Sequence, residues 1–233
     1  MSHPNNPTDP PRTTDPEEWE MLGGAIQLGV PPWLAPIAAS DDHRETPPPP
    51  PRRQQLMALC RELLTLLGED PDREGLRDTP RRWADWWLEF IEYQPGKTET
   101  TFEAVSSDQL VIVKGIRVWS LCEHHLLPFW CDISIGYIAE DNVLGLSKFA
   151  RIAHQFAHRL QLQERLTHQI ADEIQRITGS RDVVVVGEGS HLCMEMRGVK
   201  APHRMLSSVT RGRFRDLPAL RAEAMALITG RAP

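Results

Sequence analysis

The 233-residue sequence contains no run of eighteen or more apolar residues, so nothing in it predicts a membrane-spanning helix. Its first residues show neither a basic start nor an apolar stretch, which argues against a secretory signal. An excess of basic residues is also lacking, because 26 Lys and Arg stand against 32 Asp and Glu and the net charge is −6. A nucleic-acid-binding surface would be basic. We therefore expect a cytoplasmic protein with neither a membrane nor nucleic acid as its partner.

Cysteine is scarce as well, with four residues at positions 60, 122, 131 and 193. In a reducing cytoplasm so few thiols rarely form disulfides. Metal binding or catalysis is therefore the better explanation for a cysteine that lies among other reactive side chains.

Proline is concentrated at one end of the chain, since residues 1–51 hold thirteen of the twenty prolines. A segment of this composition cannot bury enough apolar surface to offset the entropy lost on ordering. We predict a disordered tail over residues 1–51, with one apolar island at 26–39 that could dock on a surface. The folded domain is expected over residues 52–233.

The remainder of the chain predicts an α+β fold, in which helices precede and separate antiparallel-looking strands. Apolar residues at helical spacing predict helices at 56–67, 79–90, 147–160, 162–177 and 218–228. Thr79 is expected to cap the second of these helices and Ser147 the third. Alternating or continuous apolar residues predict strands at 110–119, 130–138, 183–186 and 191–199.

The first candidate site is the tetrapeptide Cys122-Glu123-His124-His125, which lies between two expected strands. A thiolate and an imidazole three positions apart can reach one zinc ion if the backbone turns between them. Taken alone, the motif is equally compatible with a loop of no special function.

The second candidate site is the segment 190–197, interpreted as a strand. Alternation places its three apolar side chains on the core side of that strand. A solvent-exposed face with an incidental cysteine is the alternative, but cysteine is seldom left exposed. The polar face then collects an imidazole, a thiol, a carboxylate and a guanidinium, from His191, Cys193, Glu195 and Arg197.

Together the two segments suggest a zinc site with three protein ligands, Cys122, His125 and Cys193. Three ligands leave the fourth position open for water, as in catalytic rather than structural zinc sites. His124 and His191 remain as imidazoles suited to proton transfer near neutral pH. This combination predicts hydrolytic chemistry.

Basic residues supply a candidate phosphate site. Lys148 and Arg151 lie in the first turns of an expected helix, whose N-terminus already favours anions. The segment 197–215 adds six Lys or Arg without one acidic residue. A phosphorylated substrate would account for both features, although a solvated basic loop would account for the second equally well.

Several stretches, in this order and spacing, resemble the GTP cyclohydrolase I family over residues 55–229. They are Gly68-Glu-Asp-Pro-Asp-Arg-Glu-Gly75, Asp78-Thr-Pro-Arg81, Ser120-Leu-Cys-Glu-His-His125, Gly145-Leu-Ser-Lys148, Gln163-Glu-Arg-Leu-Thr167, His191-Leu-Cys-Met194 and Met196-Arg-Gly-Val199. The series is far more specific than any one stretch.

The resemblance implies the tunnelling fold, in which subunits pool antiparallel strands into an oligomeric barrel with helices outside, here with N-terminal helices added. It implies a homo-oligomer, a decamer of two pentameric rings. It also implies a Zn²⁺-dependent hydrolysis of GTP to 7,8-dihydroneopterin triphosphate and formate, through attack of water on C8 of guanine and a rearrangement of the ribose.

The resemblance also assigns roles to individual residues. Zinc would be held by Cys122, His125 and Cys193, as the motifs already suggest. His124 and His191 match the family's catalytic histidines, and Glu164 matches its guanine-binding carboxylate. The triphosphate-binding positions, partly contributed across subunit boundaries, match Ser147, Lys148, Arg151 and Arg197.

Some positions depart from the family's pattern. Trp130-Cys131-Asp132 replaces a common Gly-Lys pair, and the loop after Val199 is about one residue short. Arg204 stands where lysine is usual, and Arg211 where an apolar residue is common. These changes leave the expected zinc site intact and bear on the triphosphate loop.

Two other functions compete with this interpretation. A pterin synthase or a deazaguanine nitrile reductase would share the fold, but lacks the combination of Cys-Glu-His-His with a distant His-x-Cys. A purely structural zinc module would need four protein ligands, and the sequence offers three.

Overall fold

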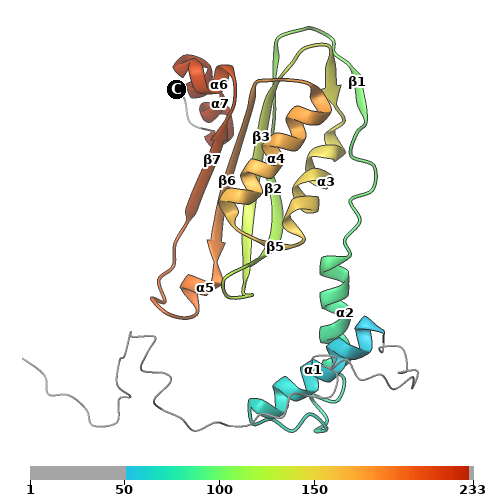
Figure 1. The fold of residues 1–233 in the computed structure, drawn as a ribbon. Helices are drawn as coiled ribbons and strands as arrows, with labels where there is room; N and C mark the ends of the chain where they lie inside the picture. The colour runs from blue at the N-terminus through green and yellow to red at the C-terminus, as the bar shows by residue number, and fades with distance from the viewer. Residues whose placement is uncertain (1–50, 231–233) are drawn as a thin grey trace, which may run out of the picture. The chain divides into compact units, whose positions relative to one another are not determined.

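A computed structural model of the chain describes residues 51–230, in which two N-terminal helices precede a sheet with helices on both of its faces (Figure 1). The predicted tail over residues 1–51, with its island at 26–39, lies outside the described residues apart from Pro51. Within residues 51–230, no helix is long and apolar enough to cross a membrane.

The N-terminal helices α1 (Arg52–Leu66) and α2 (Thr79–Ile91) form a hairpin. The side chain of Arg53 makes two hydrogen bonds to the Asp85 carboxylate, of 2.6 and 3.2 Å, and links one helix to the other. Thr79 is the first helical residue, so the N-cap position falls on Asp78, one residue before the predicted cap. Proline follows within the first turn, where its missing N–H costs nothing.

The main sheet has the strand order β5-β2-β3-β6-β7. All neighbouring strands are antiparallel except β5 and β2, which are parallel. A separate two-stranded sheet pairs β1 (Thr101–Glu103) with β4 (Asn142–Leu144). The bounds of the five main strands are β2 (Gln109–Cys122), β3 (Pro128–Ala139), β5 (Leu160–Gln161), β6 (Val183–His191) and β7 (Met205–Thr210).

One face of the sheet is covered by α3 (Leu146–Ala157) and α4 (Gln163–Thr178), as Figure 1 shows. Alternate residues of β3 point into this core, and Phe129, Cys131 and Ile133 have no exposed surface. The opposite face is partly covered by α6 (Arg213–Asp216) and α7 (Pro218–Thr229). The predicted α+β class is therefore confirmed.

The predicted strand at 191–199 is wrong. Strand β6 continues through its predicted end to His191, and the chain then forms the short helix α5 (Leu192–Glu195). The reason lies in the neighbouring strand, because Phe129 pairs with His191 and β3 has only Pro128 beyond that pair. With no neighbour to continue the ladder, the backbone N–H groups after His191 take local partners instead.

The predicted helix at 147–160 also has different bounds. It begins at Leu146, with Gly145 rather than Ser147 at the N-cap, and it ends at Ala157. Leu160, which was expected on its apolar face, lies in β5 and is 43% exposed. Pairing of β5 with the end of β2 draws this residue out of the helix.

Candidate active site

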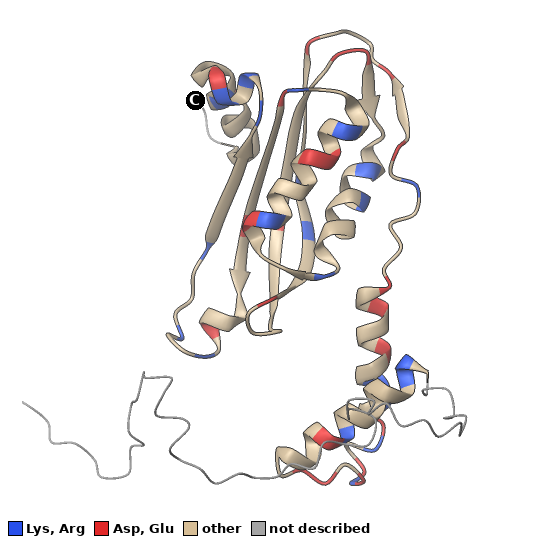
Figure 2. Ribbon diagram, in the orientation of Figure 1, with Lys and Arg blue, Asp and Glu red and all other residues tan. Residues whose placement is uncertain are grey.

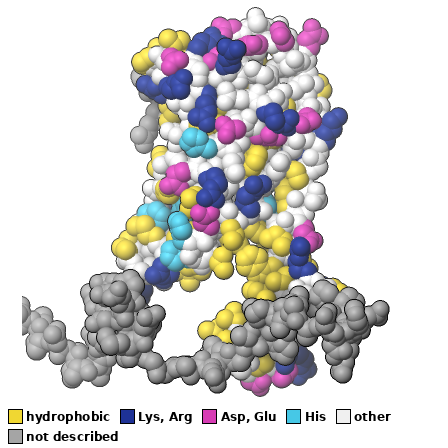
Figure 3. Space-filling model, in the orientation of Figure 1, with side chains coloured by type: hydrophobic (Ala, Val, Ile, Leu, Met, Phe, Trp, Pro, Cys, Tyr) yellow, Lys and Arg dark blue, Asp and Glu magenta, His cyan; other side chains and the backbone are white. Residues whose placement is uncertain are grey.

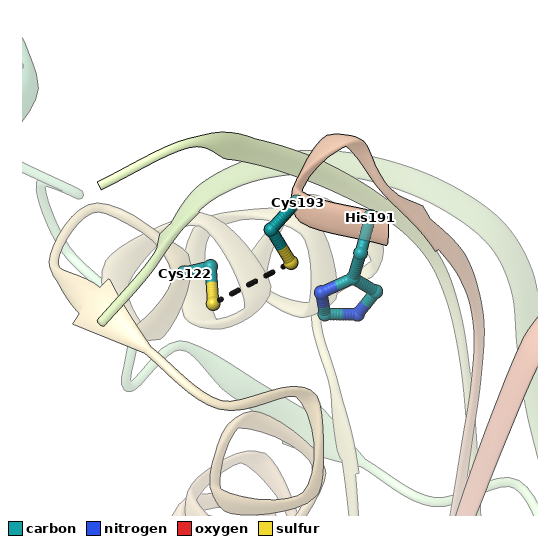
Figure 4. Close-up of side chains that lie close together, drawn as sticks. All are labelled: Cys122, His191 and Cys193. Carbon is teal, nitrogen blue, oxygen red and sulfur yellow. Dashed lines mark hydrogen bonds between the residues drawn. The ribbon is translucent and has the colours of Figure 1, made fainter. Parts of the chain in front are cut away.

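Two cysteines and one histidine meet where β2 and β6 end (Figure 4). Cys122 is the last residue of β2, His191 is the last residue of β6, and Cys193 lies in α5. The two sulfur atoms are 3.9 Å apart, and each lies within 4.8 Å of a nitrogen of His191. All four cysteines of the chain are free thiols.

The separation of the two sulfurs fits a shared metal ion. Two thiolates bound at about 2.3 Å to a tetrahedral zinc ion lie about 3.8 Å apart. The observed distance between Cys122 Sγ and Cys193 Sγ is 3.9 Å. Soft sulfur ligands together with imidazole nitrogen favour zinc over calcium or magnesium, which prefer oxygen. The donor set at this end of the sheet therefore fits a zinc ion.

The turn after Cys122 brings two more imidazoles to the site. Leu126 has a positive φ of 55°, and its N–H donates to the Cys122 carbonyl at 2.8 Å. This tight turn places Nδ1 of His124 and Nδ1 of His125 each 4.0 Å from Cys122 Sγ. Figure 3 shows several histidine side chains gathered toward the same end of the molecule.

The structure brings together most of the residues that the sequence predicted for the metal. Cys122 and Cys193 are adjacent, as expected, and His125 lies beside Cys122. The group whose donor atoms are all mutually close contains His191 rather than His125. The predicted common strand face of residues 191–197 does not exist, since Cys193 reaches the site from the first turn of α5.

His191 is held on two sides. Its ring stacks on Phe129, with ring centroids 4.3 Å apart and an angle of 7° between the planes. Its Nε2 lies 3.1 Å from Oε1 of Gln163. Burial lowers the pKa of His191, the nearby His203 lowers it further, and Glu164 opposes both effects.

Burial also governs the thiol of Cys193. Its pKa is raised by burial and by its hydrogen bond to Cys122, because a second negative charge beside the first is unfavourable. A bound cation would reverse this preference, since metal coordination deprotonates thiols.

An ion pair fixes the loop that carries the two histidines. Arg165, in the first turn of α4, makes two hydrogen bonds to the carboxylate of Glu123, of 2.5 and 3.0 Å. The arginine lowers the pKa of Glu123, mainly through these hydrogen bonds. The backbone N–H of Glu123 also donates to the Gln161 carbonyl at 3.2 Å. The loop of residues 123–125, called the metal loop below, is thereby linked to the start of α4.

The contacts of Glu123, Arg165 and Gln163 at the site were not predicted from the sequence. Each of the three belongs to a stretch that carries the family resemblance, and this membership was the only sign in the sequence of their place at the site. Their partners lie about 30 to 40 residues away in the sequence, and no local pattern reveals such pairs.

The expected substrate-binding residues divide into two groups. Glu164, in the first turn of α4, and Arg197, just after α5, are exposed at the same end of the sheet as the cysteines. Ser147, Lys148 and Arg151 lie at the start of α3. The guanidinium of Arg151 donates to the Pro95 carbonyl at 2.6 Å. Figure 2 shows basic residues in the half of α3 that is remote from the metal loop.

Some arginines of the basic segment 197–215 form ion pairs within the chain. Arg213 contacts the buried Asp182 at 2.6 Å, and Arg211 contacts Asp172 at 3.1 Å. Arg215 pairs with its neighbour Asp216 at 3.3 Å. The last three arginines of the segment therefore have carboxylate partners within the chain.

Comparison with known proteins assigns the family. The model of the family "GTP cyclohydrolase I" matches residues 56–229. The chain belongs to the GTP cyclohydrolase I family. GTP cyclohydrolase 1 of Hyperthermus butylicus is 48% identical over 168 residues, which are 72% of this chain and 86% of that protein. GTP cyclohydrolase 1 of Streptomyces griseus is 48% identical over 180 residues, covering 75% and 89% of the two chains.

Among solved structures, the archaeosine synthase QueF-Like in the apo form matches with a TM-score of 0.36 and 18% identity. The match covers 44% of this chain and 95% of that chain. It is a partial superposition.

The ion pair between Glu123 and Arg165 yields a prediction for the metal. Replacing Arg165 with Met should weaken zinc binding about 10-fold, because supporting residues around metal ligands affect affinity by 10- to 100-fold. Competition with a chromogenic chelator measures the effect. The control is Arg176→Met on the same helix, whose partners Glu173 and Glu99 lie away from the site. Equal zinc affinities in both variants would contradict the prediction.

Proposed function

We propose that this protein hydrolyses GTP to 7,8-dihydroneopterin triphosphate and formate at a zinc site on the end of its sheet. The single observation that carries the proposal is the pair of thiols 3.9 Å apart with imidazoles beside them, in a member of the GTP cyclohydrolase I family. The product feeds folate-type, biopterin-type or deazapurine-type syntheses alike.

Three residues would hold the zinc ion: Cys122, His125 and Cys193. When bound by three protein ligands, zinc supplies an activated water near neutral pH. The family resemblance assigns the third ligand to His125 rather than to His191. Nδ1 of His125 lies 4.0 Å from Cys122 Sγ, which is compatible with an ion bound by that sulfur.

The two remaining histidines carry protons. His124 and His191 both lie near Cys122, one on the loop after β2 and the other at the end of β6. Opening the imidazole ring of guanine requires a proton on the departing nitrogen and removal of one from the attacking water. Imidazoles perform both steps near neutral pH.

Glu164 would select guanine. Guanine presents the N1 hydrogen and the 2-amino group side by side, and an ionised carboxylate accepts both. Adenine has an acceptor at N1 and no 2-amino group, so the same carboxylate would be left without a donor. Glu164 is exposed at the metal end of α4, where its negative charge raises the pKa of His191. The competing explanation, a favourable interaction with the helix dipole, needs no substrate.

The triphosphate residues point to an assembly. Ala157, the last residue of α3, lies at the metal end, since its carbonyl accepts a hydrogen bond from Ser120 at 2.7 Å. Ser147 is ten residues earlier, about 15 Å farther along the helix. Ser147, Lys148 and Arg151 would therefore complete the site of a neighbouring subunit rather than that of their own.

The sheet has edges that suit such an assembly. Strand β2 has 14 residues, and β5 covers only Leu121 and Cys122 on its outer side. Strand β7 forms the other edge and, within residues 51–230, pairs only with β6. Unpaired edges readily add strands from other chains. Both edges support a barrel shared between subunits, with the decamer of two pentameric rings as the expected form.

The cytoplasm remains the proposed location, because four free cysteines, two of them close together, suit a reducing compartment.

The function is tested by formate release from GTP together with zinc analysis. We expect about one zinc ion per chain and one formate per GTP in the parent protein. Cys193→Ala and His125→Ala should lose both zinc and turnover. His124→Ala and His191→Ala should keep zinc and lose about 10²–10⁴-fold in rate, as expected for lost acid–base help. Retention of zinc by His125→Ala with its loss from His191→Ala would instead make His191 the third ligand.

Guanine selection is tested at Glu164. Glu164→Ala should lower kcat/KM for GTP by at least about 10²-fold, because truncation of one partner of a charged hydrogen-bonded pair costs several kcal/mol. The matched control is Glu173→Ala on the same helix, whose side chain pairs with Arg176. Turnover of ATP by the parent protein, or normal GTP turnover by Glu164→Ala, would contradict the assignment.

Sharing of the site between subunits is tested by complementation. Lys148→Met and Cys193→Ala should each be inactive alone, and co-expressed subunits should recover about a quarter of the parent activity. In a random mixture, half of the subunits keep Cys193 and the other half keep Lys148. A site that takes its zinc ligands from one subunit and Lys148 from another is therefore intact in about one case in four. If each site lay within one chain, the mixture would stay inactive.

A further inference from the structure

Gln163 is a fully buried polar side chain next to the proposed proton-transfer residue. It is the first residue of α4, and its amide extends toward strands β6 and β7. Its amide nitrogen lies 3.1 Å from the Gly187 carbonyl, 3.0 Å from the Met205 carbonyl and 3.3 Å from Oγ of Ser207. Its amide oxygen lies 3.1 Å from Nε2 of His191.

These partners allow one orientation of the amide. Backbone carbonyls only accept hydrogen bonds, so the atom that faces Gly187 and Met205 must be the NH₂ group of Gln163. The amide oxygen must then face His191, and this oxygen also only accepts. Nε2 of a neutral His191 must therefore carry the ring hydrogen, which leaves the lone pair on Nδ1.

Strand β6 makes room for this amide with two glycines. A Cβ at Gly189 would lie 2.6 Å from Oε1 of Gln163 and 2.4 Å from the Trp130 carbonyl. A Cβ at Gly187 would lie 2.9 Å from the sulfur of Cys131 and 3.3 Å from Oγ of Ser207, a partner of the same amide. A larger residue at Gly189 would therefore collide with the amide oxygen, and one at Gly187 would crowd Ser207, which contacts the amide nitrogen.

The ring plane is fixed independently of the amide. Phe129 stacks on His191 with an angle of 7° between the planes, so only a 180° flip about the Cβ–Cγ bond would keep the imidazole in this plane. The hydrogen bond from Nε2 to Gln163 then sets which edge of the ring faces the cysteines. Figure 4 shows the imidazole lying beside the two sulfur atoms.

We propose that Gln163 is a positioning residue that fixes His191 in the Nε2–H tautomer and leaves the lone pair on Nδ1. The proposal rests on the proposed function for the role of His191 in turnover, but the location of the ring hydrogen is independent of it. The wrong tautomer in the stacked ring would present an N–H where an acceptor is needed. The amide of Gln163 fixes the tautomer without adding a charge to the site.

The direct test is solid-state NMR of the full-length, zinc-loaded protein labelled with ¹⁵N-histidine, at a pH where His191 is neutral. The His191→Ala spectrum identifies the resonances of His191 by difference. We expect an unprotonated Nδ1 and a protonated Nε2 in the parent protein. In Gln163→Met, which has a side chain of similar length and no acceptor, we expect the two tautomers to mix. Gln163→Glu keeps an oxygen that accepts from Nε2–H but loses the donor to the Gly187 and Met205 carbonyls, so it separates the two contacts and should retain the Nε2–H tautomer.

Kinetics provide a second readout. Gln163→Met should lower kcat about 10- to 100-fold, the range seen when partners of functional imidazoles are removed, with KM for GTP changed less than about 3-fold. Zinc content should stay at about one per chain, and Gln163→Glu should recover most of kcat. The control is Gln169→Met on the same helix, which removes a hydrogen bond to Gln161 and leaves His191 untouched.

Two results would overturn the proposal. The first is an Nδ1–H tautomer in the parent protein, and the second is an unchanged tautomer with unchanged kcat in Gln163→Met. If Gln163→Met fails to fold, the tautomers of the parent protein and Gln163→Glu decide the matter. Absence of formate release by the parent protein would reject the proposed function and leave the tautomer assignment standing.

Discussion

The antiparallel ladder between β3 and β6 ends at the pair Phe129 and His191, and the whole candidate site depends on where it ends. One residue farther, the chain leaves the sheet and α5 begins, which turns Cys193 back toward Cys122. The same pairing places the ring of Phe129 where the imidazole of His191 stacks on it. A shift of β6 by one residue in this register would point His191 to the opposite face of the sheet from Phe129.

The start of α4 holds this arrangement from the other side. Consecutive residues of its first turn have separate surroundings: Gln163 contacts His191 and two strands, Glu164 is exposed to solvent, and Arg165 pairs with Glu123. One helix N-terminus therefore connects the metal loop, the proposed proton carrier and the proposed guanine site. A displacement of α4 would disturb all three together, which makes its packing on the sheet a condition for chemistry.

Other parts of the molecule bear on the proposed assembly rather than on the metal site. The open edges of β2 and β7 would pair with other copies of the chain, and the start of α3 would reach a neighbouring subunit's site, if the proposed assembly forms. The helical hairpin of α1 and α2 exposes large apolar side chains as well, among them Leu63, Leu66 and Trp86. Under the proposed function, a single chain would supply the zinc ligands but only part of the substrate site.

The sequence by itself determined the element types and the reactive residues. Long apolar periodicities predicted α1, α2, α4 and α7 and the strands β2 and β3, because burial of one face leaves a regular pattern. The reactive stretches around Cys122 and Cys193 were evident from residue type and from resemblance. Only the tertiary structure decided the strand end at His191, which depends on how far a neighbouring strand reaches rather than on the residues that follow it. It likewise decided that His191 lies in the mutually close group with both sulfurs and that Gln163 and Arg165 support the site, because contacts across tens of residues leave no periodic signal in the chain.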